Sequence, residues 1–152
     1  MSTPAPPPAT SGPEGGGGAS TVERLGFAPG QVVQEFGYDE DVADDFRFRV
    51  EDLCGTELED EDYTGEADAV LLWWRDGDGD LADALVDMVG ILGELGFVVL
   101  LTPKPGRDGE VDASEVDESA VTTGLHASGT FSVGGDWRAT KLVAPKAQAR
   151  HH

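Results

Sequence analysis

Asp68-Ala-Val-Leu-Leu-Trp-Trp-Arg75 and Gly96-Phe-Val-Val-Leu-Leu-Thr-Pro-Lys104 are two nearly unbroken apolar runs. Strands covered on both faces of a parallel sheet show no polar–apolar alternation, so each run predicts a buried strand. The segment between them has apolar residues at helical spacing: Leu81, Leu85, Met88, Leu92 and Leu95. We expect a helix from Leu81 to Leu95, begun by an Asp80 cap and ended by Gly96. Together the three segments form a βαβ unit.

A second strand–helix pair precedes this unit. Gln31–Phe36 reads as a strand, and it is polar enough to suit an edge of the sheet. After Gly37, a helical face is formed by Val42, Phe46, Val50 and Leu53. Asp39 and Asp41 are the predicted caps at its start, and Gly55 is its predicted end. The following stretch, Thr56–Ala67, is acidic, lacks apolar periodicity and is expected to be a solvated loop.

A third helix and a hairpin follow the unit. Ser114 with Asp117 fits a capping box, which predicts a helix that ends at Gly124. Two strands, His126–Val133 and Trp137–Val143, flank Gly134-Gly135-Asp136, a sequence typical of a tight antiparallel turn.

The predicted order is therefore βαβαβαββ, which indicates an α/β protein with a single Rossmann-like domain at residues 22–146. Its sheet of about five strands is expected to be mainly parallel, with a C-terminal antiparallel hairpin. Residues 1–20 are Pro/Gly-rich and predict a disordered tail, and residues 147–152 predict a frayed end.

The predicted order leaves open what covers the second face of the sheet. If the polar strand lies at an edge and the strands follow chain order, right-handed crossovers place the helices on one face. The opposite face would then be apolar and uncovered. A short helical turn at Thr21–Leu25, a second subunit in a homodimer, or a different place for the polar strand would each resolve this.

Charge limits the classes of partner. The chain carries a formal charge of −20, and the segment from Glu35 to Asp80 holds 18 acids against three bases. Such a field repels phosphate backbones and anionic headgroups, so binding to nucleic acid or to a membrane surface is not expected. A protein partner with a basic surface is compatible with it.

Cysteine and hydropathy indicate the compartment. Cys54 is the only cysteine, so the chain has no internal disulfide, and we expect this residue to act as a small buried hydrophobe. Neither a secretory leader nor an apolar run of membrane-spanning length is evident. A cytoplasmic protein is the expectation.

The carboxyl ends of the strands are where α/β sheets bind ligands. This rim comprises Gly37, Tyr38, Trp74, Arg75, Asp76, Thr102, Lys104 and Arg107. Lys104 and Arg107 could hold a carboxylate or a phosphate. Alternatively, they could offset the acids expected opposite them, at Asp76, Asp78 and Asp80.

No catalytic set and no metal site is predicted. The spacing of Asp76, Asp78 and Asp80 imitates the start of an EF-hand loop, but Leu81 stands where that loop needs glycine. His126 has no second histidine or cysteine at ligand spacing. No cofactor is expected.

Four separated motifs are Phe27-Ala-Pro-Gly-Gln-Val-Val-Gln-Glu-Phe-Gly37, Val70-Leu-Leu-Trp-Trp-Arg75, Leu100-Leu-Thr-Pro-Lys-Pro-Gly-Arg-Asp-Gly109 and Asp136-Trp-Arg-Ala-Thr-Lys-Leu142. In this order they resemble an actinobacterial family known only as a domain of unknown function. The likeness covers about Val22 to Lys146.

The element order is also similar to the second half of class I S-adenosylmethionine-dependent methyltransferases. Two departures stand out: the glycine-rich loop is reduced to Gly37, and Thr56–Ala67 leaves no room for the family's second and third strands. The second strand normally supplies the acid that holds the ribose.

Two functions remain open at this point. The first is a non-catalytic acidic binding or regulatory module that acts by protein–protein contact. The second is a minimal methyltransferase-like enzyme, or a small-molecule binder, that uses the C-terminal rim of the sheet.

Overall fold

The computed structural model describes residues 16–144, with side chains placed from residue 21 onward except at residues 94–95. The predicted tails therefore lie largely outside the described residues, although the first helix already begins at Gly16. Nine elements follow one another: α1 Gly16–Leu25, β1 Val33–Phe36, α2 Asp44–Cys54, β2 Ala67–Trp73, α3 Leu81–Ile91, β3 Leu92–Pro103, α4 Ala113–Thr122, β4 His126–Val133 and β5 Trp137–Val143.

A five-stranded sheet with the order β1-β2-β3-β5-β4 forms the centre of the molecule. β1, β2 and β3 are parallel, β5 is antiparallel to β3, and β4 is antiparallel to β5. The α/β class, the mainly parallel sheet and the C-terminal hairpin are thus confirmed. The polar strand lies at an edge, as its composition indicated.

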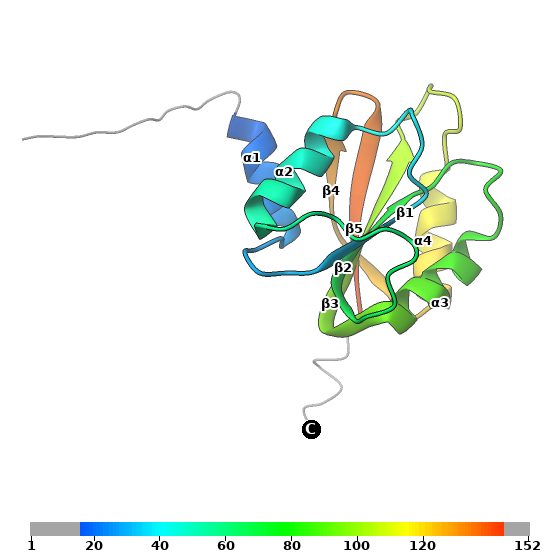
Figure 1. Ribbon diagram of the computed structural model, residues 1–152. Coiled ribbons are helices and arrows are strands. Elements are labelled where there is room, and N and C mark those ends of the chain that lie inside the picture. The colour runs from blue at the N-terminus through cyan, green and yellow to red at the C-terminus, as the bar shows by residue number, and fades with distance from the viewer. Residues whose placement is uncertain (1–15, 145–152) are drawn as a thin grey trace, which may run out of the picture.

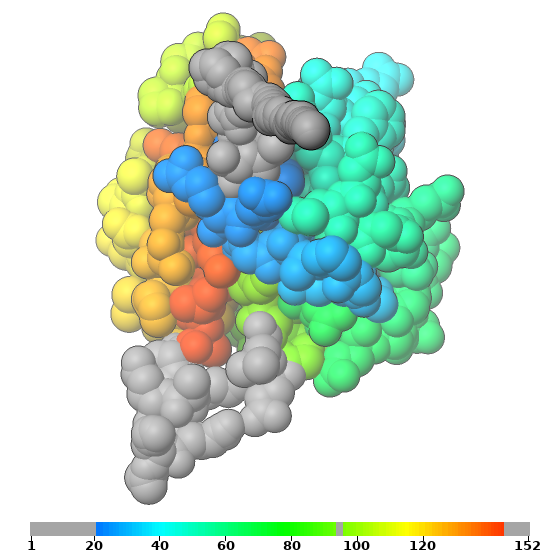
Figure 2. Space-filling model, turned by 90° about the vertical axis from the view of Figure 1, so that its left-hand side faces the viewer, coloured from blue at the N-terminus to red at the C-terminus, as the bar shows by residue number. Residues whose placement is uncertain are grey.

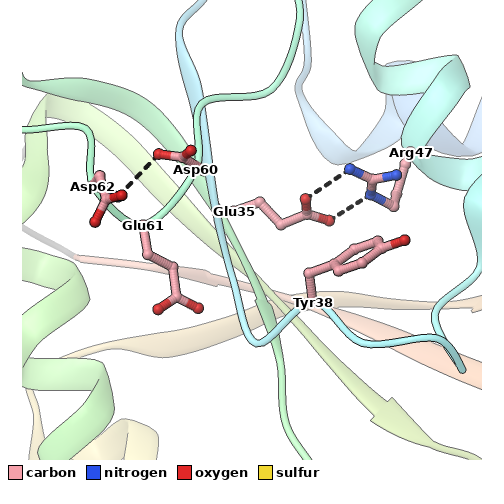
Figure 3. Close-up of a pocket in the computed structure, with 6 residues that line it drawn as sticks. All are labelled: Glu35, Tyr38, Arg47, Asp60, Glu61 and Asp62. Atoms are coloured by element: carbon pink, nitrogen blue, oxygen red, sulfur yellow. Dashed lines mark hydrogen bonds and ion pairs between the residues drawn. The ribbon is translucent and has the colours of Figure 1, made fainter.

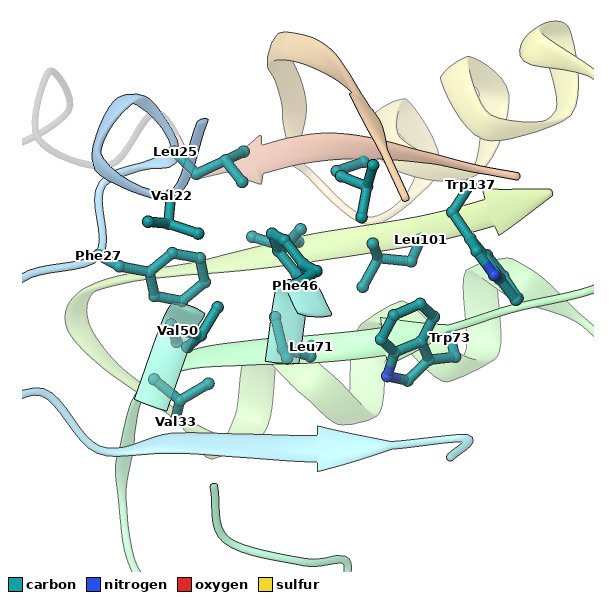
Figure 4. Packing of buried hydrophobic residues seen from close by; sticks show 14 of the residues in the cluster. Val22, Leu25, Phe27, Val33, Phe46, Val50, Leu71, Trp73, Leu101 and Trp137 are labelled. Carbon is teal, nitrogen blue, oxygen red and sulfur yellow. The ribbon is translucent and has the colours of Figure 1, made fainter. Parts of the chain in front are cut away.

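Helices cover both faces of this sheet (Figure 1). One hydrophobic cluster joins α1 and α2 to side chains such as Leu71, Trp73 and Leu101, and Figure 4 shows this packing from close by. The other cluster joins α3 and α4 to Leu72 and Trp74. The two adjacent tryptophans therefore point to opposite faces, as alternation along a strand requires.

The expectation that the crossover helices share one face is wrong. β1-β2 and β2-β3 step in the same direction along the sheet, yet α2 and α3 lie on opposite faces. The reason lies in the connection after α2, which pairs Glu59 with Gln34 before the chain enters β2. Because β2 already occupies one side of β1, this pairing places Glu59 outside the sheet edge. The α1 and α2 helices cover the apolar face, so that face gives no ground for a second subunit.

The connection from residue 55 to residue 66 is consequently more than a solvated loop. The Glu35 amide donates to the carbonyl oxygen of Glu59 at 2.9 Å, and the Glu59 amide donates to that of Val33 at 2.8 Å. The Gln34 side chain donates to the carbonyl oxygens of Asp60 and Tyr63, both at 2.9 Å. These bonds hold the acidic segment along β1, although it forms no further strand.

The boundary between α3 and β3 also differs from the prediction. α3 ends at Ile91, and Leu92 begins β3 by pairing with Ala67 of β2. Leu92 and Leu95 therefore belong to the strand, and Gly96 does not end the helix. Gly90 and Gly93 weaken helix formation in this stretch, so pairing with β2 prevails.

The predicted helix ends are partly right. Gly55 ends α2 in the left-handed conformation, and the Asp80 carboxylate accepts from the Asp83 amide at 3.2 Å. At the start of α2, however, Ala43 occupies the cap position, and Asp39 and Asp41 do not cap the helix. Asp112 precedes α4, so Ser114 lies inside that helix and makes no capping box.

Candidate functional site

Arg75 links the segments that follow the carboxyl ends of β1 and β2. Its Nε and Nη2 donate to the two carboxylate oxygens of Asp41 at 3.1 and 2.6 Å, and its Nη1 donates to the carbonyl oxygen of Gly37 at 3.1 Å. The guanidinium carbon lies 5.2 Å from the centre of the Trp137 ring. We call these four residues the Arg75 network.

The local sequence explains this arrangement. Arg75 lies two residues beyond the end of β2, while Asp41 lies in the connection that leads from β1 to α2, so parallel pairing brings them to the same rim. A bidentate guanidinium–carboxylate pair is among the stronger surface interactions. Hydrogen bonding from Arg75 and its positive charge hold the pKa of Asp41 below its usual range.

Gly37 is enclosed by backbone and side-chain partners. Its amide donates to Glu61 Oε2 at 3.0 Å, and its carbonyl oxygen accepts from Arg75. Its φ of +80° is left-handed, and a Cβ atom here would overlap the carbonyl oxygen of Trp73. This glycine serves a close approach of two strands, and its amide is already used within the chain.

The other predicted rim residues are dispersed. Trp74 and Thr102 are buried, whereas Tyr38 is 55% exposed. The backbone amide of Asp76 donates to the carbonyl oxygen of Gly109, and the backbone amide of Lys104 donates to the carbonyl oxygen of Asp136. Arg107 pairs with Asp136 at 3.1 Å, and Asp78 accepts from the Arg75 amide. Of the rim set, only Gly37 and Arg75 meet in one network.

A hollow of about 450 Å³ lies beside β1, on the outer side of this network. It is lined by Glu35, Tyr38, Arg47, Asp60, Glu61 and Asp62, which we call the acidic hollow (Figure 3). Asp60, Glu61 and Asp62 come from the segment that pairs with β1, while Tyr38 follows β1 and Arg47 lies on α2. Carboxylates line one side, and the Tyr38 ring with the Arg47 guanidinium lies on the other.

Glu35 and Arg47 join the hollow to the core. Glu35 is 6% exposed and accepts from Arg47 Nε at 2.7 Å, from Arg47 Nη2 at 2.9 Å and from Trp73 Nε1 at 2.8 Å. The Arg47 guanidinium carbon also lies 4.6 Å from the centre of the Tyr38 ring. Neither Glu35 nor Arg47 was predicted as a site residue. The signal available in the sequence was the carboxylate of Glu35, which lies within a strand among buried residues.

Among the described residues, neither a thiol site nor a metal site emerges. Cys54 is buried in the core, and burial raises the pKa of its thiol. Among residues 16–144, no group of three or more histidine, cysteine or acidic side chains has the geometry to hold a metal ion.

The Asp41–Arg75 pair predicts a pH dependence. Because the pKa of Asp41 in the folded chain lies below its unfolded value of about 3.9, the pair stabilises the fold above that pH, and the contribution is lost as pH falls through the folded pKa. We expect Asp41→Asn to lower the free energy of unfolding at pH 7 and to lower it less below about pH 4. Urea unfolding between pH 7 and pH 3 checks this, and a pH-independent difference would contradict it.

The sequence of this chain is similar to that of a known protein family. The family model described as "Protein of unknown function (DUF3052)" matches residues 22–146. The chain belongs to this family. Uncharacterized proteins of Mycobacterium tuberculosis (Rv2239c) and Mycobacterium bovis (Mb2263c) are each 48% identical over 128 residues, which is 84% of this chain and 80% of theirs. The resemblance to an actinobacterial family without known function is thereby confirmed.

Two solved structures with a similar fold are described as methyltransferases. The precorrin-6y C5,15-methyltransferase of Geobacter metallireducens matches with a TM-score of 0.59 and 9% identity, over 84% of this chain and 87% of that one. A SAM-dependent methyltransferase of Aquifex aeolicus matches with a TM-score of 0.52 and 9% identity, over 84% and 89%. At this identity the likeness shows a methyltransferase-like fold and not an activity.

No helix within residues 16–144 combines the length and the apolar character that crossing a bilayer requires.

Proposed function

We propose that this member of the family is a non-catalytic binding or regulatory module that takes a positively charged segment of a protein partner at its acidic edge. The acidic edge consists of β1 and the segment 55–66 that pairs with it, and it includes the acidic hollow. The observation that carries this proposal is that the Arg75 network links the carboxyl ends of β1 and β2, the rim where such sheets bind small ligands, while an open hollow beside it is lined with carboxylates.

The closed crevice argues against a small ligand at the rim. A ligand seated at the end of β1 would have to displace both Arg75 from Gly37 and Glu61 from the Gly37 amide. It would then meet Asp41, whose charge disfavours a carboxylate or a phosphate group. Each of these steps costs binding free energy.

The hollow has the chemistry to hold a guanidinium group. Asp60, Glu61 and Asp62 offer carboxylate oxygens, and exposed Tyr38 offers a ring. Guanidinium groups form charge-assisted hydrogen bonds with carboxylates and stack on aromatic rings. Arg47 already lies over the Tyr38 ring, an internal example of the second contact.

The charge of the acidic edge supports the same partner. This edge carries seven acids, one from β1 and six from residues 55–66, and no lysine or arginine, so its field attracts cationic segments over a distance and accelerates their association. Binding of this kind weakens as salt screens the charges.

Fluorescence anisotropy with a labelled octa-arginine peptide tests the proposal. We expect Glu61→Gln with Asp62→Asn to weaken binding at least about tenfold, because both charges face the hollow. The amide oxygen of glutamine can still accept from the Gly37 amide, so the fold should persist.

A matched control removes the same charge elsewhere. Asp117→Asn with Glu118→Gln lies on α4, on the other face of the sheet, and should change the affinity by less than about twofold. Equal weakening by the two double variants would mean that only the net charge matters, and that result would contradict a site at the hollow.

A minimal methyltransferase-like enzyme or small-molecule binder is the second candidate. The observation that favours it is the likeness of the fold to that of solved methyltransferases. On this alternative, S-adenosylmethionine would bind at the rim formed by Gly37, Trp74, Thr102 and Lys104.

A further inference from the structure

The strand β4 lies at the opposite edge of the sheet from the acidic hollow. Five of its eight residues are exposed: His126, Ala127, Ser128, Thr130 and Ser132. Figure 2 shows β4, in orange, at the surface between α1 in blue and α4 in yellow. Within the described part of the chain, β4 pairs with β5 alone, so its outer backbone groups face solvent.

The two edges of the sheet differ in how their outer backbone groups are hydrogen bonded. The outer edge of β1 is satisfied by the Glu59 backbone and by the Glu61 carboxylate on the Gly37 amide. No segment of residues 16–144 forms backbone hydrogen bonds with the outer side of β4. Unpaired edges are templates for another strand, and proteins that remain monomeric usually protect them.

The usual protective devices are weak in β4. Its sequence, His-Ala-Ser-Gly-Thr-Phe-Ser-Val, contains no proline, lysine, aspartate or glutamate. One irregularity interrupts the pairing with β5, between Ala127 and Gly129. From Gly129 to Val133, the strand is regularly paired and uncharged.

We propose that a second copy of this chain occupies the edge, with the two β4 strands antiparallel about a two-fold axis near Gly129 and Thr130. The two sheets then form one continuous sheet. Strand addition of this kind gains main-chain hydrogen bonds, and the central pairs place small neutral side chains opposite each other.

The distribution of charge favours this edge for contact between two copies. Two molecules of charge −20 repel each other at most orientations, and most strongly through their acidic edges. The hairpin from His126 to Val143 carries one acid, Asp136, against Arg138 and Lys141, so like-charge repulsion is weak there. A cationic segment of another protein would instead be attracted to the acidic edge. The dimer leaves both acidic edges free, at its two ends.

The β4 edge is distinct from the apolar face of the sheet, which α1 and α2 cover. The dimer proposal does not depend on the proposed function, because β4 contributes nothing to the acidic hollow.

Sedimentation equilibrium of the full chain tests the proposal. The weight-average mass should rise with concentration from 16.0 kDa toward twice that value. Thr130→Lys and Thr130→Glu each place like charges near the axis and should each weaken dimerisation at least about tenfold. An equimolar mixture of the two variants should recover the dimer, because opposite charges then face each other.

Val86→Lys on α3 is the control, since Val86 is 57% exposed on a helix remote from this edge in the fold. It should dimerise like the unchanged chain, with all variants checked for folding by circular dichroism. A monomer mass at every concentration would overturn the proposal. So would a dimer unaffected by the Thr130 variants, or a mixture of the two that stays monomeric.

Discussion

Glu35→Ala is expected to lower the free energy of unfolding by about 3–5 kcal/mol, the usual cost of removing one partner of a buried ion pair. The Glu35 carboxylate is almost inaccessible and accepts three hydrogen bonds, two from Arg47 and one from Trp73. Without it, a largely buried guanidinium loses its counter-charge and a buried indole N–H loses its acceptor. Chemical denaturation at neutral pH measures the effect.

Asp44→Ala is the matched control for this change. Asp44 pairs with the same guanidinium at 3.2 Å, but it is 52% exposed. Its loss, including its place in the first turn of α2, should cost less than about 1 kcal/mol. If the two variants lost equal stability, burial would not be the source of the Glu35 effect.

Gly37→Ala should be the second most damaging change, at about 3 kcal/mol or more. An alanine in the left-handed conformation costs about 1–2 kcal/mol, and its Cβ would overlap the Trp73 carbonyl oxygen, which can move only with the backbone of β2. Strands β1 and β2 would have to separate at the rim. The Arg75 network would separate with them, since Arg75 bonds the Gly37 carbonyl oxygen.

Gly106→Ala separates the cost of the left-handed conformation from the cost of the overlap with β2. Gly106 has a similar φ of +89°, but no atom lies within 4 Å of a Cβ built there. Its substitution should lower the free energy of unfolding only by the cost of placing alanine in the left-handed conformation, about 1–2 kcal/mol. Thermal or urea unfolding of both variants compares them, and equal losses would show that the close approach to β2 is unimportant.

The sheet could be predicted because its signals are local. The apolar runs at β2 and β3, the turn at Gly134-Gly135-Asp136 and the polar composition of β1 each depend on a few adjacent residues. Hydrophobic burial makes these patterns reliable. Where two signals competed, as at Leu92, the long-range pairing with Ala67 prevailed over helical spacing.

The site could not be predicted, because it depends on contacts between distant residues. Asp41 and Arg75 are 34 positions apart, and Glu35 and Trp73 are 38 apart. An acidic segment without periodicity gave no sign that Glu59 would pair with β1. That pairing accounts for the placement of α2 and α3 on opposite faces and for the acidic hollow, so one unpredicted contact explains both differences.

The central claim is that the Arg75 network closes the crevice at the strand ends, so that binding takes place at the acidic edge instead. Isothermal titration calorimetry of the full chain with S-adenosylmethionine tests it most directly. We predict no saturable heat at ligand concentrations up to about 1 mM, a range that detects the usual affinities of enzymes for their substrates. Saturable binding at micromolar concentration, abolished by Gly37→Ala in a chain that remains folded, would contradict this account and favour the methyltransferase-like alternative.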